Sequence, residues 1–493
     1  MDADLGLSSA SALAGLIARK ELASSELLDH YLQRIERLNP AINAVCTLDV
    51  DRARALASAA DAATARGDQL GPLHGLPITV KDAIATEGIR STGGATELAN
   101  HVPGEDAPVV AAVKAAGAIV FGKTNLPRWS GDAQAFNTMF GTTNNPWDLT
   151  RGPGGSSGGA SAAVAAGLTS FELGTDIGGS VRMPSHFAGV CGHKPSFGVV
   201  PQLGYLDHTT GGVLEADVNV FGPLARSVAD LERIFDVVAE PTADRAVGWR
   251  LALPGARAEQ AKQLRVAAWL DDTVCPVSAD IATALEATVA LLEGAGVPVD
   301  RAARPDVAFE EVWQTGLPLI SAATTPARTA EEWATQLAQA VAAETDAGMD
   351  PVRAMRAKAS VMTHRDWLFL DERRQLLRRK WAAFFERFDV LLCPVSPTAA
   401  FPHTQEGNVY TRTIDIDGAT RPYVDVLAWT AFIGFVYLPV TVVPVGLTGG
   451  GLPVGIQVVA PYLEDRTALQ LAGLVEQLTG GYQPPPLAQL SRT

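Results

Sequence analysis

GGSSGG at residues 154–159 and GTDIGGS at residues 174–180 are two runs of small residues that carry serine hydroxyls. A third segment, GLPITVKD at residues 75–82, places a lysine at the end of a short β-branched run. Glycines lack a Cβ, so consecutive backbone N–H groups can converge on one point. Two hydroxyls, one amine and a set of backbone donors are what acyl transfer without a histidine needs.

Each of the three polar side chains has a predicted role. Lys81 can act as a base only when it is neutral, and its position at the end of an apolar strand predicts the burial that would lower its pKa from the usual value near ~10.4. Taken alone, Lys81 could equally form a salt bridge with Asp82 or lie on the surface. Ser180 closes the turn that can bind an oxyanion, so it is the candidate nucleophile. Ser156 is the candidate proton relay.

The combination of these motifs resembles the amidase signature family, whose members hydrolyse C–N bonds with a Ser-Ser-Lys triad. The match is dense in a core at residues 72–204 and returns at residues 445–459. The resemblance implies a triad of Lys81, Ser156 and Ser180 and a cis Gly155–Ser156 bond. It also implies an oxyanion hole built from the N–H groups of Ile177, Gly178, Gly179 and Ser180. Ser157, Asp176 and Arg182 are expected to support the loops.

The segment that borders the substrate pocket in the family reads Trp129-Ser130-Gly131-Asp132 here, directly after Arg128. Many family members carry an acidic or small residue where this chain has Arg128, so the substrate does not follow from the resemblance. Met183 follows Arg182, so no second cation is available as a carboxylate clamp. The sequence therefore predicts an apolar pocket that includes Trp129, the aromatic stretch at residues 429–437 and part of the helical region at residues 303–387.

Strand and helix patterns alternate along the chain, which predicts an α/β fold with a parallel or mixed sheet. Strands are expected at residues 76–80, 118–121, 265–270, 390–393, 440–445 and 455–459, and helices at residues 107–116, 158–166, 281–292 and 466–478. The resemblance implies a single α/β/α domain over residues 1–493, with a mixed sheet of about eleven strands. Residues 303–387, nearly all helical in pattern, are expected to form a cap-like insertion in the same domain.

Two other motif matches point to different chemistry. Residues 117–124, GAIVFGKT, satisfy the phosphate-loop expression, but AIVF is typical of a buried strand and Lys123 of a structural residue at its end. Residues around Ser156 and Ser157 satisfy the G-x-S-x-G elbow of α/β-hydrolases. That elbow needs an apolar strand directly before it, and this chain has NPWDLTRGP at residues 145–153. A Ser-His-Asp site using His186, His193 or His208 is the remaining alternative.

The composition excludes several classes of protein. A net charge of −15 argues against a nucleic-acid surface, and no apolar run reaches the ~18–20 residues of a membrane span. The acidic N-terminus does not resemble a secretory signal, so a cytoplasmic location is expected. The four cysteines show no C-x-x-C spacing, and neither a metal nor a cofactor is expected.

The leading hypothesis is a free-standing amidase acting on neutral apolar or aryl amides, with a carbamate or ester hydrolase as an alternative. A second hypothesis is the glutaminase subunit of a tRNA-dependent amidotransferase, which would need partner chains. A third is a scaffold without activity, against which the complete triad argues. The expected binding partner is a small-molecule amide or carbamate. The oligomeric state to test is a homodimer.

Overall fold

The computed structural model describes residues 4–206, 212–324, 329–349, 351–409 and 411–489. Its main feature is a mixed sheet of eight strands in the order β10-β9-β11-β15-β14-β7-β8-β6. The β10, β9 and β11 strands run parallel to one another, and every other neighbouring pair is antiparallel. The strands of this sheet are β6 (Glu172–Asp176), β7 (Cys191–Lys194), β8 (Val220–Ala225), β9 (Val266–Ala268), β10 (Val299–Asp300), β11 (Val390–Pro394), β14 (Val440–Leu447) and β15 (Pro453–Val459).

A second sheet has three strands in the order β1-β3-β2. Its strands are β1 (Val45–Leu48), β2 (Pro77–Lys81) and β3 (Ile119–Thr124), and β2 lies beside the edge strand β6 of the large sheet. The prediction of a single sheet of about eleven strands is thus not confirmed: hydrogen-bonded pairing stops at β6. Where the two sheets meet, the Thr79 N–H donates to the Thr169 hydroxyl and the Ser170 N–H to the Pro77 carbonyl instead of forming a ladder.

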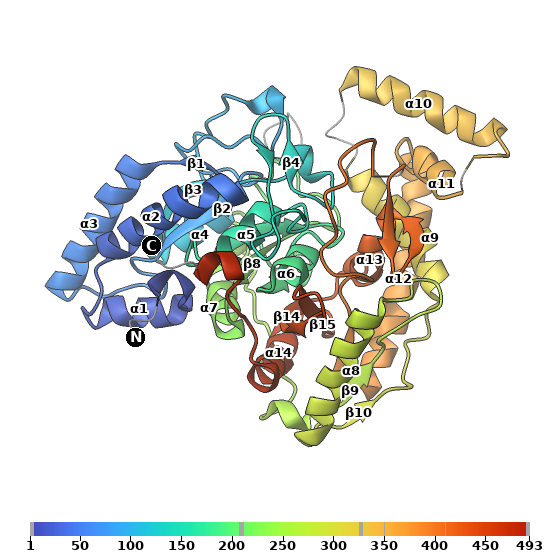
Figure 1. Ribbon diagram of the computed structural model, residues 1–493. Helices are drawn as coiled ribbons and strands as arrows, with labels where there is room; N and C mark the ends of the chain where they lie inside the picture. The colour runs from blue at the N-terminus through green and yellow to red at the C-terminus, as the bar shows by residue number, and fades with distance from the viewer. Residues whose placement is uncertain (1–3, 207–211, 325–328, 350, 410, 490–493) are drawn as a thin grey trace.

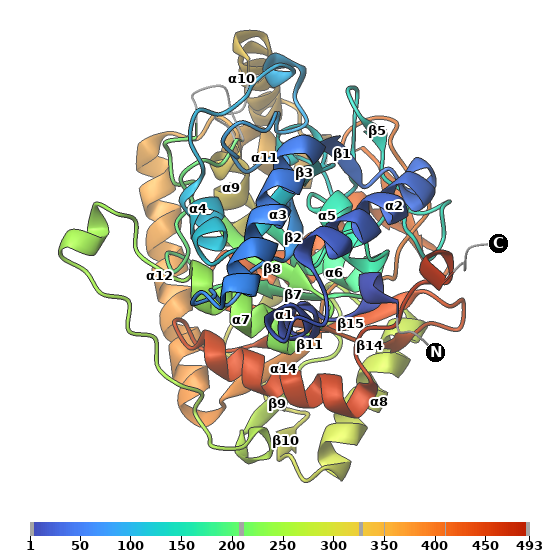
Figure 2. The same ribbon diagram turned by 90° about the vertical axis from the view of Figure 1, so that its left-hand side faces the viewer.

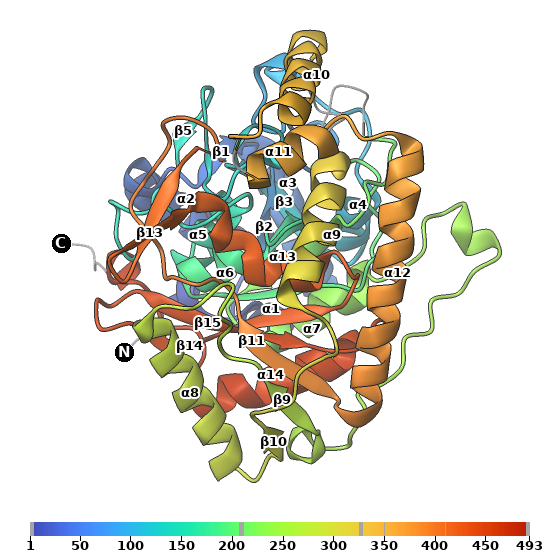
Figure 3. The same ribbon diagram turned by 90° about the vertical axis from the view of Figure 1, so that its right-hand side faces the viewer.

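Helices cover both faces of the large sheet (Figures 1, 2 and 3). Figure 2 shows α7 and α14 in front of the strands, and Figure 3, from the opposite side, shows α6, α8, α9, α12 and α13. The helices are α1 (Ala10–Ala18), α2 (Ser24–Ile42), α3 (Val50–Arg66), α4 (Pro108–Ala115), α5 (Gly158–Ala165), α6 (Arg182–Ala188), α7 (Val228–Val238), α8 (Ala279–Gly294), α9 (Phe309–Ala323), α10 (Ala330–Thr345), α11 (Pro351–Ala359), α12 (His364–Arg387), α13 (Ala428–Gly434) and α14 (Asp465–Thr479).

Local sequence explains the elements that hold the motifs. Every residue of β2 is buried, as expected for an apolar β-branched run between two layers. Every residue of α5 is buried as well, and its small Gly, Ala and Ser side chains let neighbouring backbones approach it on all sides. Six of the residues at 117–124 form strand β3 (Ile119–Thr124) rather than a phosphate loop, and the buried Lys123 ammonium donates to the Ile84 carbonyl at 2.5 Å and to the Thr86 hydroxyl at 2.7 Å.

The region at residues 303–387 forms helices α9 to α12. In Figure 1, α10 extends away from the rest of the molecule, while α9 and α12 lie along it. The function of this region as a cap stays a prediction. Two short hairpins, β4–β5 (Phe136–Asn137 and Gly141–Thr142) and β12–β13 (Thr413–Ile416 and Ala419–Pro422), complete the strands. No helix in the described part of the chain has the length and apolarity to cross a membrane.

Candidate active site

Lys81 meets two hydroxyls at the junction of the two sheets. Its ammonium nitrogen Nζ lies 2.6 Å from Ser156 Oγ and 2.6 Å from Thr175 Oγ1. Lys81 ends β2, Thr175 lies in β6, and Ser156 lies in the loop before α5, after a cis Gly155–Ser156 bond as the resemblance implied. Three segments far apart in sequence thus converge on one amine. Sequence reasoning did not select Thr175.

The surroundings of Lys81 favour its neutral form. The side chain is fully buried, and this burial lowers its pKa from 10.5 to about 7, although the charges of Asp176 and Glu172 act in the opposite direction. Burial also raises the pKa of Glu172 to about 7, so this carboxyl is only partly ionised near neutral pH. A large fraction of Lys81 is therefore unprotonated at neutral pH and can accept a proton.

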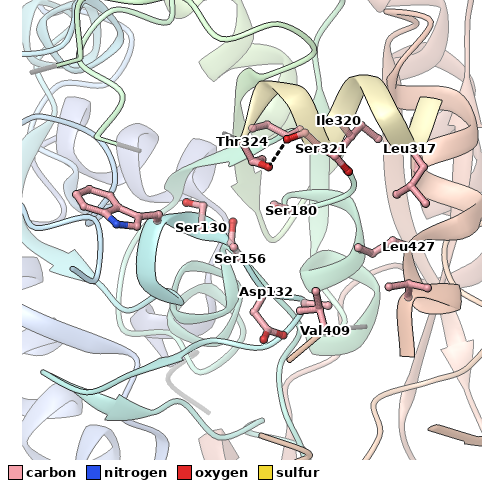
Figure 4. A pocket seen from close by; sticks show the side chains of 18 of the residues that line it. Ser130, Asp132, Ser156, Ser180, Leu317, Ile320, Ser321, Thr324, Val409 and Leu427 are labelled. Carbon is pink, nitrogen blue, oxygen red and sulfur yellow. Dashed lines mark hydrogen bonds between the residues drawn. The ribbon is translucent and has the colours of Figure 1, made fainter. Parts of the chain in front are cut away.

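Ser156 and Ser180 line the same cavity, which has a volume of about 210 Å³ (Figure 4). Ile177, Gly178 and Thr175 line it too, so the reacting groups and the glycine-rich turn face one space. The turn needs glycine at position 179, because its φ is +132° and a Cβ there would lie 2.3 Å from the Thr430 hydroxyl oxygen. The arrangement places the Ser180 hydroxyl, the candidate nucleophile, beside a set of backbone N–H groups.

The four expected oxyanion donors are not equivalent. The Gly179 N–H donates to Asp176 Oδ1 at 2.9 Å, whereas the N–H groups of Ile177, Gly178 and Ser180 are not engaged by that carboxylate. The Asp176 carboxylate also pairs with Arg182, at 2.7 Å from its Nη2. Although burial by itself would raise the pKa of Asp176, the Arg182 charge keeps it below its usual value. Ile177, Gly178 and Ser180 therefore remain as the candidate donors to an oxyanion.

The three support residues make contacts inside the chain. Arg182 donates to the Thr430 carbonyl at 2.6 Å and to Gln457 Oε1 at 3.1 Å, so it connects the turn to α13 and β15. The Ser157 hydroxyl donates to the Thr175 carbonyl at 3.2 Å and holds β6 against the start of α5.

Trp129, Ser130, Gly131 and Asp132 all line the cavity. The Asp132 carboxylate, however, is already bound within the chain, because Arg412 forms an ion pair with it and the Tyr423 hydroxyl donates to it at 2.7 Å. Asp132 therefore holds Arg412 and Tyr423 in place, and its oxygens are engaged before any substrate arrives.

The apolar wall of the cavity includes Trp129 and part of the helical region at residues 303–387, as predicted, and further residues that the sequence did not single out. The residues besides Trp129 come from α9 and from the segment before α13: Trp313, Leu317, Ile320, Val409, Tyr423, Val424 and Leu427. The prediction that the aromatic residues at 429–437 line the cavity is wrong. Trp429 and Phe432 are buried in the core against Phe309 and Trp269, and of that stretch only Ala431 is among the described lining residues.

The histidine alternative finds no support in the described residues. His186 Nδ1 lies 2.7 Å from the Gly455 N–H and its Nε2 lies 3.2 Å from the Thr398 carbonyl, and burial lowers its pKa to about 4. His193 is held between Thr441 and Asp465. His208 lies outside the described residues. No cluster of three or more His, Cys, Asp or Glu side chains that could hold a metal occurs in the described part of the chain.

Comparisons with known proteins show the family to which the chain belongs. The profile of the family described as Amidase matches residues 26–469. The chain is 32% identical to a glutamyl-tRNA(Gln) amidotransferase subunit from Roseiflexus sp. (strain RS-1), over 95% of this chain and 96% of that protein. It is also 32% identical to the indoleacetamide hydrolase of Bradyrhizobium diazoefficiens, over 95% of this chain and 86% of that one.

A solved structure shares the fold. A bacterial aryl acylamidase of the amidase signature family superposes with a TM-score of 0.81 at 23% identity, covering 99% of each chain. At 23% identity, this similarity is evidence for the fold alone.

Proposed function

The chain belongs to the amidase family, whose members hydrolyse amide C–N bonds, and on this premise we propose that it hydrolyses neutral apolar or aryl amides through an acyl-enzyme on Ser180. The observation that carries the proposal is the buried Lys81 amine, 2.6 Å from Ser156 Oγ and with a pKa of about 7. A buried lysine in this state is a base matched to neutral pH.

In the proposed reaction, Ser180 Oγ attacks the amide carbonyl carbon. The Ser180 proton passes to Ser156 Oγ while the Ser156 proton passes to neutral Lys81. The carbonyl oxygen becomes an oxyanion, which accepts hydrogen bonds from the candidate N–H donors of the 177–180 turn. The C–N bond then breaks, and the leaving nitrogen takes a proton back from Lys81 through Ser156. A water molecule then attacks the acyl carbon and gives its proton to Ser156 Oγ while the Ser156 proton passes to Lys81. The bond between the acyl carbon and Ser180 Oγ breaks, the carboxylic acid leaves, and Ser180 Oγ takes a proton back from Lys81 through Ser156.

The shape and lining of the cavity support the substrate class. Its wall carries Trp129, Trp313, Leu317, Ile320 and Leu427. Contact with apolar surface contributes roughly 25 cal/mol per Å² of area removed from water, so an aryl or alkyl group would gain several kcal/mol there. We therefore expect anilides and similar bulky amides to be preferred over small polar amides.

Labelling with a fluorophosphonate followed by peptide mapping tests the nucleophile. The adduct is expected on Ser180, and Ser180→Ala should remain unlabelled while it stays folded. An adduct on Ser156 or Ser157 would overturn the assignment.

The second candidate is the glutaminase subunit of an amidotransferase, which the 32% identity to the Roseiflexus protein favours. The decisive measurement is kcat/KM of the isolated chain for an anilide and for glutamine. A preference for glutamine would replace the proposal with this alternative. The homodimer expected from the sequence is checked by light scattering on the same preparation.

A further inference from the structure

The backbone of the turn at residues 178–180 is held by hydrogen bonds, because its two glycines have no side chain to restrain it. Gly178 has open space where a Cβ would lie, and Gly179 has a φ of +132°, which L side chains rarely adopt. The direction of each N–H group in this turn therefore depends on what binds the neighbouring carbonyl and N–H groups.

Backbone groups bind two of the three carbonyls of the turn. The Gly179 carbonyl accepts a hydrogen bond from the Met183 N–H at 2.7 Å, and the Ser180 carbonyl accepts one from the Ser157 N–H at 3.2 Å. The C=O and N–H of a trans peptide point in opposite directions, so the contact with Met183 turns the Ser180 N–H away from α6.

The third carbonyl, that of Gly178, is bound by a side chain. The buried Thr430 hydroxyl in α13 donates to it at 2.7 Å. The same hydroxyl lies 3.0 Å from the Leu427 carbonyl, but Leu427 is the N-cap residue of α13, and the carbonyl of an N-cap residue already accepts the first bond of its helix. The other side of the peptide is fixed as well, since the Gly179 N–H donates to the Asp176 carboxylate at 2.9 Å.

The charged pair that fixes this other side also holds Thr430. Arg182 Nη1 donates to the Thr430 carbonyl at 2.6 Å, and the Arg182 guanidinium pairs with the Asp176 carboxylate at 2.7 Å. All three side chains are fully buried. The position of the Thr430 hydroxyl is therefore defined relative to the turn.

These contacts anchor the peptide between Gly178 and Gly179 on both sides, and two candidate oxyanion donors flank it. The Gly178 N–H lies one peptide before it, and the Ser180 N–H lies one peptide after it. Without the Thr430 hydroxyl, this peptide would be anchored on one side only, and glycine resists changes of φ and ψ less than any other residue. The two flanking N–H groups would then lose their fixed directions.

We propose that Thr430 is a positioning residue, whose hydroxyl aligns the Gly178 and Ser180 N–H groups with the oxyanion that forms on the substrate carbonyl. This inference rests on the proposed function, because it assigns Thr430 to the same acyl transfer. Aligned donors stabilise the transition state more than the bound substrate. Loss of the hydroxyl should therefore lower kcat and leave KM nearly unchanged.

The test compares Thr430→Val, which removes the hydroxyl and keeps the side-chain volume, with Thr430→Ser, which keeps the hydroxyl. Release of nitroaniline from 4-nitrobutyranilide gives kcat and KM. In Thr430→Val we expect kcat to fall about 10–100-fold while KM changes less than about twofold. Thr430→Ser should restore most of kcat. Circular dichroism verifies that the variants are folded, and Thr430→Ala replaces Thr430→Val if the latter does not fold.

Thr288→Val is the matched control. The Thr288 hydroxyl is also buried and donates to a backbone carbonyl, that of Ala284, at 2.8 Å. None of the described residues that line the cavity comes from α8, where Thr288 lies. This variant should therefore retain the kcat of the wild type.

A transition-state analogue distinguishes a positioning role from a purely structural one. Ser180 Oγ adds to the carbonyl carbon of an alkyl trifluoromethyl ketone, the Ser180 proton passes to Lys81 through Ser156, and the ketone oxygen becomes an oxyanion. The affinity for this ketone should fall in Thr430→Val by the same factor as kcat. The affinity for the intact anilide, measured by calorimetry in the Ser180→Ala background, should not change.

Unchanged kcat in Thr430→Val would refute the inference, and so would a loss of affinity for the anilide equal to that for the ketone. If the wild-type chain cleaves no amide but binds the ketone, the proposed function fails, and the ketone affinities of the Thr430 variants alone decide the inference. A wild-type chain that neither cleaves an amide nor binds the ketone would overturn both.

Discussion

Replacing Lys81 with methionine tests the central electrostatic feature of the site. The folded state lowers the pKa of Lys81 from 10.5 to about 7, so between these values the unfolded chain binds a proton that the folded chain does not. The contribution of Lys81 to the stability of the wild-type protein therefore rises with pH in this window and is lowest below about pH 7. The difference in pKa corresponds to about 5 kcal/mol at about 1.4 kcal/mol per pH unit.

The expected result is that the free energy of unfolding depends more steeply on pH in the wild type than in Lys81→Met. Lys81→Met removes the lysine titration but also leaves the Ser156 and Thr175 hydroxyls without the amine, a cost of about 1–3 kcal/mol that does not vary with pH. Glu172, whose pKa is about 7, is ionised above about pH 8, so measurements there isolate the lysine.

Between about pH 8 and about pH 9.5, the free energy of unfolding of the wild type should rise by about 2 kcal/mol relative to the variant. Urea-induced unfolding followed by circular dichroism at several pH values measures this, and Lys262→Met, at an exposed lysine, serves as the control. Parallel pH dependences for wild type and Lys81→Met would refute the lowered pKa and with it the proposed base.

Three further predictions concern activity. Because the base must be neutral, kcat/KM on an anilide should increase as pH rises through about 7. In Lys81→Ala and in Ser156→Ala, kcat/KM should fall by several orders of magnitude while the protein remains folded. Full activity in Lys81→Ala would exclude the mechanism. Thr175→Val keeps the side-chain volume but removes one contact to the Lys81 amine. We therefore expect kcat to fall about tenfold and the midpoint of the pH dependence of activity to move. An unchanged pH profile would show that the contact is dispensable. Gly93→Ala should lower activity mainly by reducing the amount of folded protein, since φ at this position is +60° and the added methyl would lie 2.5 Å from the Leu206 carbonyl oxygen and 3.2 Å from the Trp129 ring, and an unchanged melting temperature would contradict that explanation.

Several features were predictable from local sequence. The Lys81, Ser156 and Ser180 motifs are contiguous segments whose residue types indicate their chemistry, and the structure brings Lys81 within 2.6 Å of Ser156 and places both serines on one cavity. The β2 and α5 elements were also predictable, because a β-branched apolar run and a small-residue run each favour one conformation. These inferences needed only neighbouring residues.

Other features depended on contacts between distant segments. The role of Thr175 appears only when β6 packs beside β2, and the end of pairing at β6 depends on how two sheets meet rather than on any strand pattern. The aromatic stretch at 429–437 looks like a pocket wall in sequence, yet α9 packs over it and takes Trp429 and Phe432 into the core.

The sequence by itself determined the candidate reacting groups, the family and the α/β class, because side-chain chemistry and hydrophobic period are local properties. Only the tertiary structure decided which side chains enclose the substrate and which of the described donors stay unpaired. Apolar residues in a core and in a pocket obey the same burial preference, so composition cannot distinguish Trp429, which fills the core, from Trp313, which lines the cavity. Packing of helices over the sheet makes that distinction.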